Sequence, residues 1–315
     1  MCTGRTTQPL FRKYVGKYLG HVALLWAALA CNDHPAGPVD PGPAPDPLIA
    51  YTYESAGARS RIGVIKPDGS EQRFITDGTV EATLAAWSPN GQQLSMSYQG
   101  IAGRNPQLYS IGLDGTDLRA IPIGTQAGRS SSWAPTGNQV AFDNFYGLFV
   151  VNPDGSGLRA LLDEEHDNGV PVWSADGAWI AFTGFAPGFG DGASRRLYVV
   201  RPDGSGLRRL ASTIPQAIIK ASWSPDGKHL VFDTSNGNLH LVNVATNDVS
   251  ALVTTPAIEE HPAWSPDGTR IAFSRRSETG AHIFTVRIDG TDERQVTSGA
   301  GSHDWPAWQP LAASR

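Results

Sequence analysis

The chain has 315 residues, of which 40% are hydrophobic and 17% charged, and its formal net charge is −5. This composition excludes a disordered chain and a coiled coil, because both need few apolar residues or a surplus of charge. The acidic balance also excludes the basic surface that nucleic-acid binding requires. Glycine (35 residues) and proline (23 residues) are abundant, which predicts many short elements joined by turns.

Residues 1–30 have the features of a signal peptide. Four basic residues and no acidic one occur in residues 1–17, and the apolar run over residues 18–30 is too short for a stable membrane-spanning helix. The run ends in Ala-Leu-Ala-Cys at residues 28–31, which resembles the lipobox of bacterial lipoproteins, with the leucine two rather than three places before the cysteine. After cleavage Cys31 would have no disulfide partner. We therefore expect Cys31 to be lipidated; the alternative is an ordinary signal peptide.

Residues 31–47 are predicted to be a tether that begins with the lipidated cysteine. Residues 32–47 contain six prolines, a density that neither helix nor sheet accommodates. In an extended polyproline conformation of about 3.1 Å per residue, this segment reaches on the order of 50 Å. Loss of residues 1–30 removes four basic residues, so the mature chain has a net charge of −9.

From residue 48 onward one motif recurs. Copies and variants of Trp-Ser-Pro-Asp-Gly begin at Trp87, Trp133, Trp173, Trp223 and Trp264, and a degenerate sixth copy begins at Trp308. The spacing of these tryptophans averages about 44 residues. A repeat of forty-odd residues with β-type composition is typical of propeller blades.

Each repeat is predicted to contain four strands. In the repeat around Trp173 we expect strands over residues 170–174, 179–183, 197–200 and 207–210, with turns at residues 175–177 and 202–204. Three further strands, over residues 49–51, 62–64 and 74–75, precede the first motif, and one strand around Trp308 follows the last. Together these would close a sixth blade and leave no open sheet edge. The sequence therefore predicts an all-β fold: a six-bladed β-propeller of four-stranded antiparallel blades over residues 48–315.

The repeats resemble those of the TolB-like β-propeller family, whose mark is the Trp-Ser-Pro-Asp-Gly turn followed by an Ile-Ala-Phe-type strand. Here that strand occupies residues 180–182, 231–232 and 271–273. The resemblance covers nearly all of residues 48–310. It leaves no room for the N-terminal α/β domain of full-length family members or for a peptidase domain, so we expect a stand-alone propeller lipoprotein. The resemblance is specific for the repeat and not for one function, because such propellers act as binding modules, gates and enzymes.

The two faces of the ring differ. The first and third connections of each blade, which are the short Asp-Gly-type turns, share one face, here called the turn face. The second connections and the links between blades share the other, here called the loop face, where the sequence varies most, as in residues 99–105, 184–194 and 275–280. Variable loops on a rigid scaffold are common binding sites, so we expect binding on the loop face.

Candidate binding residues lie on the predicted links and loops of the loop face. They are Glu165, His166, Glu260, His261, His303 and Asp304 on the links, with Phe185 and Phe189 in the glycine-rich loop. Histidines beside carboxylates could ligate a transition metal, and some members of the resembled family are lyases of pectate fragments with a His-ligated metal. Their ligand pattern does not map onto this sequence. The alternative is that these histidines only bond backbone groups. We expect an electronegative mouth on this face.

No catalytic motif is present in the sequence, whether a nucleophile elbow, a phosphate loop, a HExxH pair or a zinc spacing of paired cysteines. The leading hypothesis is a monomeric, non-enzymatic lipoprotein of the bacterial cell envelope, without metal or cofactor. It would face the periplasm or the cell surface, touch the membrane only through its lipid, and bind a protein or glycan but no nucleic acid. The alternatives are a metal-dependent carbohydrate lyase or hydrolase at the channel mouth and a structural subunit of an envelope complex.

Overall fold

The computed structural model describes residues 46–99, 105–162, 169–185 and 194–311. The chain divides into two units, residues 1–44 and 45–315, and all described residues belong to the second. Every regular element of the described residues is a β-strand. The described part of the chain contains no helix that is long and apolar enough to cross a membrane.

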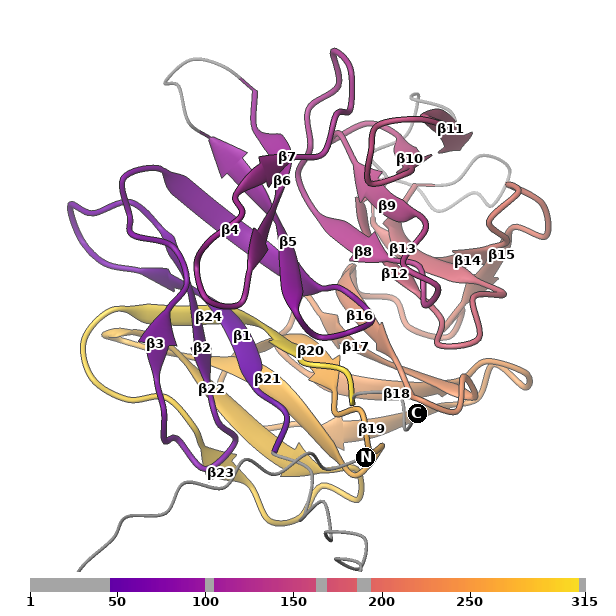
Figure 1. Cartoon of the computed structure of the whole chain (residues 1–315). Coiled ribbons are helices and arrows are strands. Elements are labelled where there is room, and N and C mark those ends of the chain that lie inside the picture. Colours follow the sequence, from indigo (N-terminus) through magenta and orange to yellow (C-terminus); the bar gives the residue numbers. More distant parts are fainter. Residues whose placement is uncertain (1–45, 100–104, 163–168, 186–193, 312–315) are drawn as a thin grey trace, which may run out of the picture. The chain divides into compact units, whose positions relative to one another are not determined.

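Twenty-four strands form six four-stranded antiparallel sheets, which are the six blades of a β-propeller (Figure 1). Blade 1 contains β24 (Ser302–Trp308), β1 (Ile49–Glu54), β2 (Arg61–Ile65) and β3 (Arg73–Phe74). Blade 2 contains β4 (Glu81–Trp87), β5 (Gln93–Gln99), β6 (Gln107–Gly112) and β7 (Arg119–Ala120). Blade 3 contains β8 (Ser131–Trp133), β9 (Val140–Asp143), β10 (Leu148–Val151) and β11 (Arg159–Leu162).

The remaining blades follow the same order from the innermost to the outermost strand. Blade 4 contains β12 (Gly169–Trp173), β13 (Ile180–Gly184), β14 (Arg196–Val200) and β15 (Arg208–Leu210). Blade 5 contains β16 (Ile218–Trp223), β17 (His229–Thr234), β18 (Leu239–Asn243) and β19 (Val249–Val253). Blade 6 contains β20 (Glu259–Trp264), β21 (Arg270–Ser277), β22 (Gly280–Arg287) and β23 (Arg294–Gln295). The four strands expected in blade 4 are confirmed to within one residue at each end.

The ring is closed by both ends of the described chain. In Figure 1 the yellow strand β24 lies beside the indigo strand β1, and the two pair antiparallel, with Ile49 opposite Trp308 and Glu54 opposite Ser302. The predicted closure, three N-terminal strands and one C-terminal strand in one blade, is confirmed. At the turn face, Gln309 N donates to Leu48 O (2.8 Å) and Leu48 N donates to the Gln309 side chain (3.1 Å).

The recurring turn folds through its own side chains. In blade 5, Ser224 Oγ donates to Asp226 Oδ1 (2.6 Å), which also accepts from Lys228 N (3.0 Å), and Gly227 has a φ of +68°. The hydrogen bond from Ser224 is the largest cause that lowers the pKa of Asp226. Since the aspartate is occupied within its own turn, the repeated motif is architecture, as the sequence predicts.

A repeated aromatic pair fills the middle of four blades. The phenylalanine of each Ile-Ala-Phe-type strand is fully or almost fully buried and stacks on a ring of the next strand; the pairs are Phe142–Phe149, Phe182–Tyr198, Phe232–His240 and Phe273–Phe284. Blade 1 is different, because Tyr51 lies opposite Gly63. A Cβ at position 63 would meet Tyr51 Cζ at 2.4 Å, so only glycine leaves room for that ring.

Three of the six motif tryptophans are hydrogen-bonded to a neighbouring blade. Trp87 Nε1 donates to Ala307 O of blade 1 (2.9 Å), and Trp223 Nε1 donates to Val172 O of blade 4 (3.0 Å). Trp133 Nε1 donates to Ser95 Oγ of blade 2 (2.9 Å). Each bond links the last residue of one innermost strand to the preceding blade, so the sequence-based assignment of tryptophan to packing between blades is confirmed.

Candidate functional site

The innermost strands β4, β8, β12, β16, β20 and β24 line a central channel. The residue three places before each motif tryptophan has a special position. It lies in a bulge of the innermost strand in five blades and directly before β8 in blade 3; these residues are Leu84, Ser130, Val170, Lys220, His261 and Trp305. Four of them, Leu84, Val170, His261 and Trp305, have φ between +54° and +58°. Such backbone is costly for residues other than glycine and persists only where the surroundings hold it.

Buried polar side chains hold these bulges. The residue after the central aromatic or methionine of each second strand is a threonine, serine or aspartate in all six blades and is at most 7% exposed; they are Thr52, Ser97, Asp143, Thr183, Asp233 and Ser274. Thr52 Oγ1 accepts from Leu84 N of the next blade (3.1 Å). Ser97 Oγ donates to Gly128 O (3.1 Å), and Thr183 Oγ1 donates to Ile219 O (2.9 Å), again in the next innermost strand or the link before it.

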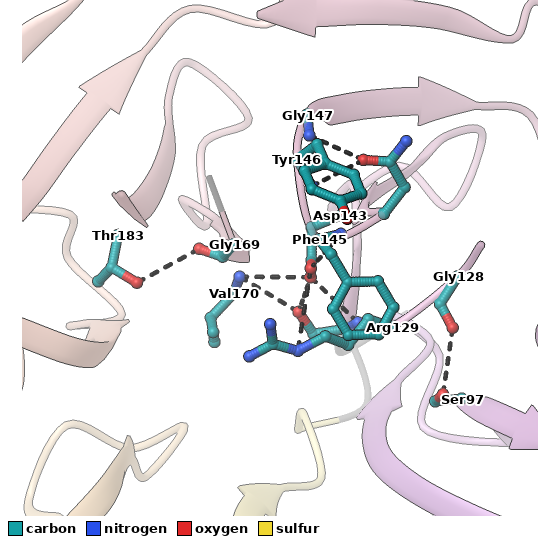
Figure 2. A network of polar contacts seen from close by, with 12 residues as sticks. Ser97, Gly128, Arg129, Asp143, Phe145, Tyr146, Gly147, Gly169, Val170 and Thr183 are labelled. Carbon is teal, nitrogen blue, oxygen red and sulfur yellow. Dashed lines mark hydrogen bonds and ion pairs between the residues drawn. The ribbon is translucent and has the colours of Figure 1, made fainter. Parts of the chain in front are cut away.

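Asp143 holds the innermost strands of blades 3 and 4 together. Its carboxylate accepts from the backbone N–H of Ser130 (3.1 Å) and of Val170 (3.4 Å), and from the Ser130 hydroxyl. Figure 2 shows Asp143 between Val170 and Arg129, whose Nε lies 4.0 Å from Oδ2. Because Asp143 is fully buried, this set of donors compensates for the loss of water around its charge.

The Arg129 side chain leads from this buried network to the loop face. It is 28% exposed, and its guanidinium carbon lies 5.3 Å from the ring centroid of Phe145, a geometry that permits a cation–π contact. Phe145 is 40% exposed and Tyr146 is 64% exposed, on the connection between β9 and β10. Two exposed aromatic residues therefore follow β9, and Arg129 lies beside the first of them, Phe145 (Figure 2).

Asp233 links the innermost strands of blades 5 and 6, as Asp143 links those of blades 3 and 4. Oδ1 accepts from Lys220 N (2.7 Å) and Oδ2 from His261 N (2.9 Å). The carboxylate is fully buried, and burial raises its pKa against the opposing effect of His261. Lys220 Nζ extends into the channel and donates to Pro306 O of blade 1 (3.2 Å). Burial lowers the pKa of Lys220 to about 8.

His261 and Asp304 form a close pair between blades 6 and 1. His261 Nδ1 lies 2.7 Å from Asp304 Oδ1, and its ring stacks on Trp305 with centroids 3.6 Å apart. Burial by itself would raise the pKa of Asp304, but the interaction with His261 and the hydrogen bond from Trp305 N lower it to about 2. His261 is 5% exposed, so its contacts with the surrounding strands cover most of its surface.

The other predicted residues of these strands lie apart from this pair. Glu260 is bound to Arg276 Nε (2.5 Å), and the neighbouring Glu259 is bound to Arg275 Nε (3.0 Å). His303 does not join His261. It is 2% exposed and packs against the rings of Tyr51, Tyr53 and His282, with centroids 5.1 to 5.3 Å apart.

The structure places Glu260, His261, His303 and Asp304 within strands β20 and β24 rather than on the links before them. The reason is that β20 starts five residues and β24 six residues before its motif tryptophan, and both strands include the bulge. Glu260 and Asp304 are paired with bases, so they do not form an uncompensated acidic surface.

Four of the predicted residues, Cys31, Glu165, His166 and Phe189, lie outside the described residues. Phe185 is partly buried and follows directly after β13. Within residues 46–99, 105–162, 169–185 and 194–311, no three His, Cys, Asp or Glu side chains come close enough to hold a metal ion. His261 and Asp304 are a pair without a third ligand.

Our sequence reasoning missed Lys220, Asp143, Asp233 and Trp305. Alignment of the six repeats on their tryptophans would have found them. Three residues before each tryptophan, Lys220 and Trp305 differ strongly from Leu84 and Val170, and both aspartates directly follow the phenylalanine of an Ile-Ala-Phe-type strand.

A second feature of the channel is a cavity of about 420 Å³ that extends toward the turn face. Its wall includes motif tryptophans and turn prolines, among them Trp87, Trp133, Trp173, Pro89 and Pro135, together with alanines, valines and serines of the innermost strands. Lys220 and Trp305 line the end of the cavity nearest the loop face. The two ends of the channel therefore differ: the turn-face end is a mostly apolar cavity, and the other is crossed by polar contacts.

Comparison with known proteins agrees with this architecture. The sequence model of the family described as "TolB beta propeller domain" matches residues 46–312. The chain is 32% identical over 90 residues to the Tol-Pal system protein TolB of Haemophilus influenzae, a match that spans 29% of this chain and 21% of that protein. This covers about a fifth of the length of that curated relative.

Two solved structures show the same fold. The crystal structure of TolB from Acinetobacter baumannii superposes with a TM-score of 0.71 at 19% identity, over 84% of this chain and 67% of that one. An oligogalacturonate lyase in complex with manganese superposes with a TM-score of 0.55 at 15% identity, over 79% of this chain and 73% of that one. Since the family match spans six closed blades and the recurring tryptophan motif, the chain belongs to the TolB β-propeller family.

Proposed function

We propose that the protein is a monomeric, lipid-anchored binding propeller of the bacterial cell envelope, which uses its loop face to bind a protein; a glycan is the second class of ligand for the same face. Membership of the TolB β-propeller family supports a binding role, since the relative in Haemophilus influenzae is a Tol-Pal system protein. That the ligand is a protein is part of our proposal, because the match covers only about a fifth of that relative.

The exposed group formed by Arg129, Phe145 and Tyr146 carries the proposal. Tyrosine and arginine are enriched among the residues that dominate the binding energy of protein interfaces. Here the backbone of Arg129 is held by its N–H donated to Asp143 O (3.0 Å), its Nε lies 4.0 Å from the Asp143 carboxylate, and the ring of Phe145 is exposed beside it. A site whose base is rigid and whose top is exposed is preorganised for binding.

The attachment point of the proposed anchor is consistent with this use of the loop face. The described chain starts at Asp46, and Leu48 is bonded to Gln309 at the turn face. A tether that follows the lipidated Cys31 would thus join the ring on the side opposite to the loop face. The function of residues 31–47 would be that of a spacer between the lipid and the ring.

Photo-crosslinking in cells that produce the full chain tests the binding face. A photoreactive phenylalanine analogue at position 146 should give a discrete adduct, and Arg129→Ala should reduce its yield. The matched control is position 158, since Leu158 is also an exposed residue of blade 3 (37%) but lies in the third connection, on the turn face. Equal adducts from both positions, or an adduct from position 158 alone, would place binding elsewhere.

Cell fractionation tests the anchor separately. Cys31→Ser should move the mature protein from the membrane fraction to the soluble fraction while leaving its thermal unfolding unchanged, because the ring begins only at β1. A wild-type protein that is soluble and has an unmodified N-terminus would contradict the anchoring proposal and leave the binding proposal standing.

A further inference from the structure

The apolar cavity at the turn face has the features of a small-molecule site. Ligand sites are mostly concave and apolar, with volumes of about 300–1,000 Å³ and a few polar groups that orient the ligand. The cavity described here has about 420 Å³ and is lined mostly by apolar residues, among them motif tryptophans, prolines and alanines, with serine side chains of the innermost strands between them. The tryptophans of the lining that are only partly buried, Trp133, Trp264, Trp305 and Trp308, favour an apolar body with an aromatic or aliphatic surface.

One cationic side chain lines the inner end of this cavity. The Lys220 ammonium has three N–H donors, and the hydrogen bonds of the described residues use one of them, to Pro306 O. Its position 5.5 Å from the ring centroid of Trp305 keeps the ammonium beside the cavity wall. Further N–H donors are therefore available to an acceptor in the cavity.

Asp233 and Asp304, the two carboxylates that stabilise the charge of Lys220, are hydrogen-bonded to other donors. Asp233 accepts the backbone N–H groups of Lys220 and His261. Asp304 accepts from Trp305 N (2.8 Å) and lies against His261 Nδ1. Neither residue lines the cavity, whereas Lys220 does. A ligand that enters from the turn face thus meets apolar walls first and a cation at the end.

From this arrangement we infer that the turn-face cavity is a second binding site, separate from the loop face, for a small amphiphilic anion. The planar aromatic or aliphatic body of the ligand packs between the tryptophan rings, and its carboxylate or sulfonate accepts hydrogen bonds from Lys220. Charge complementarity decides the class of ligand, because a cationic head would be repelled by the ammonium and a neutral one would leave the available N–H groups without an acceptor.

Two fluorescent probes with similar aromatic bodies test this inference. 1-Anilinonaphthalene-8-sulfonate carries an anionic head, and N-phenyl-1-naphthylamine has no charge. Both should bind the purified mature protein with one site each, and the anionic probe should bind more tightly. Lys220→Met keeps the length and the apolar stem of the side chain. It should weaken the anionic probe at least about tenfold and change the neutral probe less than about twofold.

A second variant tests the cavity without altering the charge. Leu84 lines the cavity at the position that Trp305 occupies in blade 1, and the two have φ of 58° and 56°. Leu84→Trp therefore suits the local backbone, fills the cavity and should abolish binding of both probes while cooperative thermal unfolding is retained. Should Lys220→Met not fold, Leu84→Trp and the two probes on the wild type still decide the question. Anionic-probe affinity that is unchanged by Leu84→Trp, or no stronger than that of the neutral probe, overturns the inference.

Discussion

Asp143 and Asp233 occupy equivalent positions two blades apart, and each carboxylate accepts backbone N–H groups from two adjacent innermost strands. In the other blades a serine or threonine stands at this position. The hydroxyls of Thr52, Ser97 and Thr183 each make one hydrogen bond to the next blade. A carboxylate has more acceptor sites than a hydroxyl, so it can hold two strands at once. The channel is thus most firmly tied between blades 3 and 4 and between blades 5 and 6.

Asp233→Ala should lower the free energy of unfolding by about 2–4 kcal/mol, because two backbone N–H groups lose their acceptor in a buried place. Asp233→Asn keeps one acceptor and removes the buried charge, so its cost should be smaller. Urea denaturation measures both. The control is Asp248→Ala at an exposed position, where a change within about 0.5 kcal/mol is expected. Equal effects at positions 233 and 248 would show that the hydrogen bonds accepted by Asp233 do not stabilise the propeller.

Stability should fall in mild acid because of His303. Burial, with a smaller effect of His282, lowers the pKa of His303 to about 4. The imidazole of His303 therefore binds a proton near pH 6.5 in the unfolded chain but only near pH 4 in the folded chain. The contribution of the neutral imidazole to the free energy of unfolding is fully present above pH 6.5 and is lost as the pH falls toward 4. At pH 5 the loss should be about 2 kcal/mol relative to pH 7.5.

The measurement compares urea unfolding of the wild type and of His303→Gln at both pH values. The variant should lose less stability on acidification than the wild type, since glutamine does not titrate. Parallel losses in the two proteins would assign the acid sensitivity to other groups.

Gly63→Ala should destabilise blade 1 by about 2–4 kcal/mol, because the new Cβ would lie 2.4 Å from Tyr51 Cζ in a fully buried layer. Thermal unfolding should show a lower Tm. Tyr51→Leu in the same chain removes the clashing ring, so the cost of Gly63→Ala should shrink in that background. A purely additive double mutant would mean that the ring and the glycine do not interact.

Truncation after Thr297 should abolish cooperative unfolding. It removes β24, which supplies the innermost strand of blade 1 and the acceptor of the Trp87 indole, Ala307 O. The loss should exceed the ~3–5 kcal/mol typical of removing one buried tryptophan, since a sheet edge is also opened. Truncation after Pro310 keeps β24 and serves as the control. An unchanged Tm after the longer truncation would mean that the ring closes in another way.

Added manganese, zinc or calcium should leave Tm unchanged, because a ligand raises stability only where the native state binds it, and the described residues offer His261 and Asp304 without a third ligand. A rise in Tm that disappears in His261→Ala would instead support the alternative of a metal-dependent lyase or hydrolase at the channel.

Local chemistry determined much of the fold. The tryptophan repeat, with its proline, aspartate and glycine, specifies one turn wherever it occurs, since each of these residues favours a defined turn conformation. Counting the repeats therefore predicted six blades, the closure by Trp308 and the strands of blade 4. The polar ring of Thr52, Ser97, Asp143, Thr183, Asp233 and Ser274 was also readable, had the repeats been aligned beyond the turn.

The candidate sites were decided by tertiary structure. Which side chains meet across the channel depends on the bulges in β20 and β24, where one extra residue changes the direction in which the following side chains point. For that reason His261 meets Asp304, whereas His303, one residue earlier, packs between blades. Lys220 reaches Pro306 only because blade 5 and blade 1 face the same channel, 86 residues apart in sequence. The repeat pattern of the sequence does not predict this contact, because it arises only when the blades close into a ring.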